Sequence, residues 1–222
     1  MIICMNRGSK PKGNVEIKWS SNFAYAIGLM ASDGNVSKDG RHITFVSKDK
    51  EQIENFAKCL DIDNKISPHK SGSTSKDSFR IQFGDVTFIL FLKDIGITSA
   101  KSKTIGSVLV PKKYFFDYLR GEFDGDGSIY SYWDKRWKSS FMFYLCFASA
   151  SNKHIIWLQN EINNCLNFTG HITKSKNSSV FQLKYGKADS IKIIEKMYCN
   201  SSSVHLSRKK LKIDKILAIV AK

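Results

Sequence analysis

The chain has 222 residues, and its 35 Lys and Arg outnumber its 20 Asp and Glu to give a formal net charge of +15 at pH 7. Its apolar runs fall far short of the ~20 residues that a membrane helix needs, and its cysteines and histidines lack the spacing of a zinc site. A membrane-spanning protein and a zinc module are therefore excluded. Because so much positive charge needs a polyanion to offset it, nucleic acid is the expected partner.

The first predicted helix follows a basic N-terminal tail over residues 1–19 and contains the stretch AIGLMASDG, Ala26–Gly34. Asp33 stands at its carboxyl end, and Gly34 ends it, as glycine commonly does just beyond a helix. In the next segment, His42–Leu60, alternating apolar residues predict a strand, and apolar residues at helical spacing predict a helix after it.

A second strand-and-helix unit completes this half. Apolar residues alternate through Ser78–Ile97 up to Gly84, after which an apolar helix is expected. A polar linker over residues 98–113 leads to the next helix and contains a proline that suits a helix start. Asp49 and the Ser151-Asn152 pair stand where the middle helices of the two halves should have their N-caps.

The first motif recurs 93 residues later (126 − 33) in the stretch LRGEFDGDG, Leu119–Gly127. Phe23, Tyr25, Gly28, Asp33 and Gly34 return as Phe116, Tyr118, Gly121, Asp126 and Gly127. The same strand and helix order follows the second copy, and a basic helix closes the chain. The predicted division is a tail over 1–19, a first half over 20–97, a linker over 98–113, a second half over 114–200 and a C-terminal basic helix over 201–222.

Small residues line both motif helices, at Ala24, Gly28 and Ala31 in one and at Gly121 and Gly125 in the other. Such stripes allow two helices to approach closely. The prediction is an α+β fold in which two αββαββα halves, related by a pseudo-two-fold axis, share a central two-helix interface. Each half adds an antiparallel sheet with one apolar face on its helices and one open polar face.

The pairing of the motif helices brings Asp33 and Asp126 together at two helix carboxyl ends, which already carry partial negative charge. Such a site favours cations. Oxygen ligands without His or Cys suit Mg²⁺, and other divalent ions such as Mn²⁺ or Ca²⁺ also fit, with the carbonyls of Ser32 and Gly125 as further ligands. An acidic pair in a basic chain suggests metal-assisted phosphodiester hydrolysis.

The two motifs resemble the paired motifs of a LAGLIDADG homing endonuclease in its single-chain form. The resemblance implies saddle-shaped sheets over double-stranded DNA and a staggered cut at a long non-palindromic site. It also implies a monomer whose metal-binding acids are Asp33 and Asp126. In the family a basic residue after the third helix of each half assists catalysis. This points to Lys101, with Lys103 as second choice, and to Arg208 or Lys209, of which Arg208 is preferred.

The motifs depart from the family pattern at Ala31 and Glu122, and no role is transferred to Val46 or Ala148 at the ends of the second strands. Two alternatives stay open: a maturase that binds its own intron RNA, and a DNA-binding regulator that does not cut. Because both acids are present, the endonuclease is favoured. The expected location is intracellular, in a bacterial or phage-host cytoplasm or an organelle matrix.

The halves differ in their first β-connection, which is short in the first half but runs over Ser128–Ser140 in the second, with aromatic and basic residues interleaved. The aromatics either pack under the loop or contact nucleic acid. If they contact it, one half-site should be read more extensively. The predicted DNA-binding residues are Arg41, Thr44, Lys48, Lys70, Arg80, Gln82, Tyr130, Tyr132, Arg136, Lys138, Tyr144, Lys174, Lys176, Gln182 and Lys184.

Overall fold

The computed structural model describes residues 13–71, 74–137, 139–174 and 178–221. The predicted contacts at Lys138 and Lys176, and most of the predicted tail, lie outside these residues. No helix in the described ranges is long and apolar enough to cross a membrane.

The two halves repeat one element order. The first half contains α1 (Ser21–Ser32), β1 (Gly34–Val36), β2 (His42–Ser47), α2 (Lys50–Leu60), β3 (Ser67–Ser71), β4 (Thr74–Gly84) and α3 (Val86–Asp94). The second contains α4 (Phe115–Asp126), β5 (Ser128–Trp133), β6 (Phe141–Ser149), α5 (Asn152–Leu166), β7 (His171–Lys174), β8 (Phe181–Tyr185) and α6 (Lys187–Met197). Two 3₁₀ turns, η1 (Lys101–Lys103) and η2 (Lys112–Tyr114), lie in the connection, and α7 (Ser207–Val220) follows.

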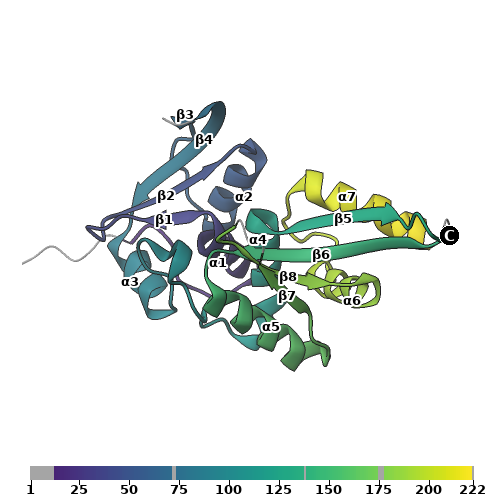
Figure 1. The fold of residues 1–222 in the computed structure, drawn as a ribbon. Coiled ribbons are helices and arrows are strands. Elements are labelled where there is room, and N and C mark those ends of the chain that lie inside the picture. Colours follow the sequence, from purple (N-terminus) through teal and green to yellow (C-terminus); the bar gives the residue numbers. More distant parts are fainter. Residues whose placement is uncertain (1–12, 72–73, 138, 175–177, 222) are drawn as a thin grey trace, which may run out of the picture.

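Each half forms a four-stranded antiparallel sheet, in the order β1-β2-β4-β3 in the first and β5-β6-β8-β7 in the second. Figure 1 shows the sheets on opposite sides of the central pair α1 and α4. In β2 and β6 alternate residues such as Ile43, Phe45, Phe143 and Leu145 are fully buried, as the period of a strand requires. The predicted α+β fold of two αββαββα halves is confirmed.

The centre of the molecule is the contact between α1 and α4, whose backbones touch at Gly28 and Gly121. A Cβ on Gly28 would lie 2.8 Å from the amide nitrogen of Glu122 and 3.0 Å from Gly121 Cα. A Cβ on Gly121 would lie 3.0 Å from Gly28 Cα and overlap the Tyr25 carbonyl oxygen. The predicted stripes of small residues are therefore the helix–helix interface.

The glycines after the two acids do not take the conformation expected of a helix-terminating glycine. Gly34 is already the first residue of β1, and Gly127 is extended, with φ −76° and ψ 159°. What excludes a side chain is crowding by the helix before each of them. A Cβ on Gly34 would lie 2.7 Å from Met30 Cα, and one on Gly127 would lie 2.6 Å from Phe123 Cα.

We expect Gly28→Ala to lower the free energy of unfolding by about 1–3 kcal/mol, the usual effect of overpacking a tight interface. The added methyl group would press the Tyr118 carbonyl and the Glu122 amide, which outweighs the better helix preference of alanine. Urea denaturation measures the change. Gly106→Ala is the control, because a Cβ there meets nothing within 4 Å. Equal midpoints for the two variants would refute the tight contact.

Candidate catalytic site and nucleic-acid interface

Asp33, which follows the last residue of α1, and Asp126, the last residue of α4, lie together at one end of the helix pair. A Cβ on Gly125 would lie 3.1 Å from Asp33 Oδ2, so the first acid leans against the end of the other helix. Both residues are exposed, yet the protein atoms around the carboxyl groups desolvate them. This burial, followed by the charge of Asp126, raises the pKa of Asp33 to about 6. Burial and the nearby Glu122 raise the pKa of Asp126.

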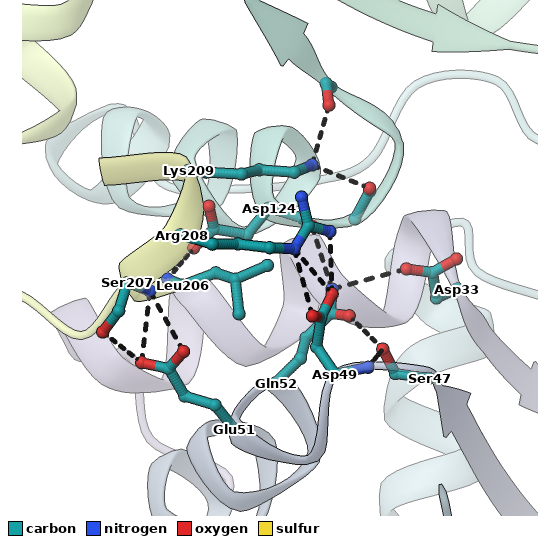
Figure 2. A network of polar contacts seen from close by, with 12 residues as sticks. Asp33, Ser47, Asp49, Glu51, Gln52, Asp124, Leu206, Ser207, Arg208 and Lys209 are labelled. Atoms are coloured by element: carbon teal, nitrogen blue, oxygen red, sulfur yellow. Dashed lines mark hydrogen bonds and ion pairs between the residues drawn. The ribbon is translucent and has the colours of Figure 1, made fainter. Parts of the chain in front are cut away.

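Two buried lysines bracket these acids. Lys101 Nζ donates hydrogen bonds to the carbonyl oxygens of Gly34 at 2.5 Å and Ser32 at 3.4 Å, the residues on either side of Asp33. Lys209 Nζ donates to the carbonyls on either side of Asp126, at 3.0 and 2.7 Å (Figure 2). It also donates to the Phe123 carbonyl at 2.5 Å. Burial lowers the pKa of both lysines, and that of Lys209 falls to about 8.

The structure places Lys209, and not the preferred Arg208, beside the acid of the second half. Arg208 points the other way and forms a bidentate ion pair with Asp49, with N–O distances of 2.7–3.0 Å. Adjacent residues of a helix point about 100° apart, so an error of one residue in register moves the charge out of the site. In the first half Lys101 is buried, whereas the second choice, Lys103, is exposed.

Gln52 was not singled out by the sequence, although it links the two motif helices. It is 3% exposed and donates from Nε2 to the Asp124 carbonyl at 3.0 Å, with Asp33 Oδ2 at 3.5 Å (Figure 2). The Ser47 hydroxyl donates to Gln52 Oε1 at 2.6 Å and fixes the amide. The available signal was the position of Gln52, a polar residue four and eight residues before Phe56 and Leu60 on the apolar face of its predicted helix.

Glu122, a departure from the motif pattern, belongs to a buried polar cluster in the second half. It accepts hydrogen bonds from Tyr118 Oη at 2.5 Å and from His154 Nε2 at 2.9 Å, and His154 Nδ1 lies 2.7 Å from the Gly106 carbonyl. Burial opposes the charged imidazolium, but the charge of Glu122 and these hydrogen bonds outweigh burial and raise the pKa of His154. Because a carbonyl can only accept, His154 Nδ1 donates to Gly106, and the ring bridges the Gly106 carbonyl and Glu122. Sequence spacing alone did not reveal this role.

A metal ion would have to use few protein side chains, because the described ranges contain no group of three or more His, Cys, Asp or Glu that could hold one. Mg²⁺ suits such a site, since it is commonly held by one or two carboxylates and completes its shell with water or phosphate oxygens. The Ser32 and Gly125 carbonyls accept from lysines but keep a second lone pair. The two acids and their carbonyls therefore fit magnesium better than zinc.

The open faces of the two sheets carry most of the predicted DNA-binding residues. Their positions follow from the strand pairing, since directly paired residues of a sheet share a face. Thr44 pairs with Gln82 in the first sheet, and Tyr130 pairs with Tyr144 in the second. Arg80, Tyr132, Gln182 and Lys184 lie on these same two faces by alternation. Arg41 and Lys48 are exposed just outside the ends of β2.

Two predicted contacts lie on the other side of the strands. Lys174 pairs with Phe181, which packs on the core, and its Nζ lies 4.7 Å from the centroid of the Phe181 ring. Lys70 pairs with Asp77 and alternates with the residues of the open face. Lys70 and Lys174 therefore do not share the open faces with the other predicted DNA-binding residues.

The aromatic residues of the long β5–β6 connection divide between the two faces. Tyr130 and Tyr132 both stack on Tyr144, with ring centroids 5.2 and 6.3 Å apart, and form an exposed ladder on the open face. Trp133 packs against Phe141 on the opposite face. Arg136 lies exposed in the turn and pairs with Asp134 at 3.2 Å.

We expect Asp33→Asn to stabilise the folded chain at pH 8 and to lose this advantage as the pH falls through 6 towards 4. A carboxyl group whose pKa is raised in the folded state opposes folding once it is ionised, so its removal helps only above the pKa of the unfolded chain. Urea midpoints at several pH values measure this. In the control Asp39→Asn the sign is opposite, because a hydrogen bond from Ser37 lowers the pKa of Asp39. A destabilised Asp33→Asn variant at pH 8 would contradict the crowding of the acids.

No family model and no curated protein sequence matches the chain. Solved structures do. Full-length WhiA (DUF199/WhiA) of T. maritima is 16% identical with a TM-score of 0.57 over 92% of this chain, which spans only 62% of that protein. The LAGLIDADG homing endonuclease I-LtrWI, solved bound to target DNA, is 14% identical with a TM-score of 0.57 over 89% of each chain.

I-DmoI, a homing endonuclease solved in complex with DNA and Mn, is 16% identical with a TM-score of 0.52 over 84% of this chain and 98% of that one. At identities this low, structural likeness establishes the fold and not the activity. The repeated halves, the helix pair and the two sheets agree with all three structures, and the chain has the LAGLIDADG fold.

Proposed function

We propose that the chain is a sequence-specific DNA endonuclease that makes a staggered double-strand cut at a long non-palindromic site. The observation that carries this proposal is the paired arrangement in which each acid at the helix junction has its own buried lysine. Two open sheet faces with polar, basic and aromatic residues flank that junction. A net charge of +15 supports a duplex as the partner. The comparison with nucleases of the same fold adds support.

In this proposal Asp33 and Asp126 each hold a divalent ion, with the Ser32 and Gly125 carbonyls beside them. The ion, when bound, would activate water and stabilise the leaving oxygen of a scissile phosphate. Lys101 and Lys209 orient the carbonyls around each acid and add positive charge where the phosphate approaches. Because the pKa of Lys209 is about 8, its side chain is protonated in most molecules at neutral pH.

One chain contains both acids and both lysines, so the proposed active state is a monomer. Two other functions use the same surfaces: binding of intron RNA, and binding of DNA without cleavage. Neither alternative needs a pair of acids whose ionisation is held back by burial, and the presence of that pair favours cleavage.

We expect Asp33→Asn and Asp126→Asn each to reduce double-strand cleavage at least about a hundredfold while DNA affinity changes little, because the acids hold metal and the sheets hold DNA. Duplexes selected from a random library in Ca²⁺ would serve as substrate, with cleavage started by Mg²⁺ and followed on gels. Selected duplexes that bind tightly but stay intact with the unaltered chain would favour the non-cleaving alternative. Selection of RNA over duplex DNA would favour the maturase.

We expect duplex affinity to fall steeply with salt, with a slope of log K against log [salt] steeper than about −3, because each phosphate contact releases condensed counterions. Fluorescence anisotropy at several salt concentrations measures the slope. Arg80→Ala should make it shallower by about 0.9 if Arg80 contacts a phosphate, whereas Lys174→Ala should leave it unchanged. A slope shallower than about −3 would rule out a long duplex footprint on the two sheets.

A further inference from the structure

The two site lysines come from different parts of the chain. Lys101 begins the turn η1, after the last helix of the first half, and Lys209 lies in the first turn of α7, after the last helix of the second half. Each is tied by backbone hydrogen bonds to a short neighbouring segment. The Ile105 amide donates to the Lys101 carbonyl at 2.8 Å, and the Lys209 amide donates to the Leu206 carbonyl at 3.0 Å. Contacts that hold these segments in place therefore also hold the backbones of the two lysines in place.

The segment before Lys209 is held by α2, which belongs to the first half. Asn55 donates to the His205 carbonyl at 2.8 Å, and the Glu51 carboxylate accepts from the Ser207 amide at 3.1 and 3.2 Å and from its hydroxyl. Asp49 adds the bidentate pair with Arg208. Figure 2 shows Glu51 and Asp49 reaching the start of α7 beside Lys209.

The segment after Lys101 is held by α5, which belongs to the second half. The Ser151 hydroxyl donates to the Ile105 carbonyl at 2.5 Å, and His154 Nδ1 donates to the Gly106 carbonyl at 2.7 Å. Both side chains are 2% exposed. The N-terminal parts of α2 and α5 thus take equivalent roles, and each acts across the boundary between the halves.

The N-cap residues of these two helices support the same interpretation. Asp49 and Ser151 occupy the N-cap positions of α2 and α5, but neither side chain caps its own helix. Each helix thereby forgoes a capping hydrogen bond, which typically stabilises a helix by about 1 kcal/mol. Both residues instead direct their oxygens to Arg208 and Ile105 in the lysine-carrying segments.

We propose that α2 and α5 act as cross-half clasps, each of which positions the lysine that serves the acid of the opposite half. The catalytic consequence rests on the proposed nuclease function. Asn55 and Ser151 are positioning residues in this scheme, since they act on the lysines through the backbone. Loosening one clasp shifts one lysine within its site and leaves the other in place. The α7 segment stays docked without Asn55, because Arg120 and Asp124 of α4 hold Val204 and Leu206.

Asn55→Ala and Ser151→Ala form a matched pair of variants. Each removes one side-chain hydrogen bond to a carbonyl four residues from a lysine, at His205 before Lys209 and at Ile105 after Lys101. With a duplex labelled differently on its two strands, we expect each variant to slow the nicking of one strand by about tenfold, and a different strand in each case. Ser151→Thr, which keeps the hydroxyl, should recover most of the rate.

Gln159→Ala is the control, because it also removes a bond from a helix amide to a loop carbonyl, at Gly170, but touches neither lysine segment. It should slow both strands equally or not at all. Equal slowing of both strands by Asn55→Ala and Ser151→Ala, or selective slowing by Gln159→Ala, would overturn the proposal.

Hydrogen–deuterium exchange on the full chain tests the clasps without any nuclease activity. Asn55→Ala should speed amide exchange at residues 206–210 and not at 102–106, and Ser151→Ala should do the reverse. If the unaltered chain cuts no DNA, the proposed function fails, while this exchange pattern still decides the clasps. Unchanged exchange in both segments would refute them.

Discussion

The close contact between α1 and α4 is the constraint on which the other features of this fold depend. Gly28 and Gly121 lie so near each other that each lacks room for even a methyl group. Helices this close place their carboxyl ends side by side, so Asp33 and Asp126 must share one region of space. The two sheets then have to extend on opposite sides of the helix pair, as Figure 1 shows. One steric requirement thereby determines both the acidic centre and the surfaces around it.

Bringing two helix ends together creates an electrostatic difficulty, which the lysines resolve. The last carbonyls of a helix have no partner within the helix and carry partial negative charge. Many helices satisfy them with a glycine in the left-handed conformation. Here Lys101 and Lys209 satisfy them instead, so Gly34 and Gly127 are free to continue directly into strands. The same ammonium groups offset the two carboxylates, although burial still raises the pKa of both acids.

Repetition in the sequence was enough to predict the halves, the helix pair and the acids, because each of these leaves a pattern in neighbouring residues. Features that depend on orientation by a single residue could not be predicted in the same way. Arg208 and Lys209 are adjacent but lie about 100° apart on their helix, and Lys174 sits on a strand of only four residues. Pairings between distant residues, such as Gln52 with the Asp124 carbonyl, leave no local pattern at all.

The duplicated plan does not produce two identical sites. Glu122 stands where the first motif has Leu29, and its buried carboxylate has hydrogen-bond partners in Tyr118 and His154, both in the second half. This charge helps to raise the pKa of both acids, although it lies within only one half. Lys209 also donates to a third carbonyl, that of Phe123, whereas Lys101 donates to two. Repetition of the backbone therefore reproduces the geometry of the acids, while the buried partners of each helix make their electrostatic environments unequal.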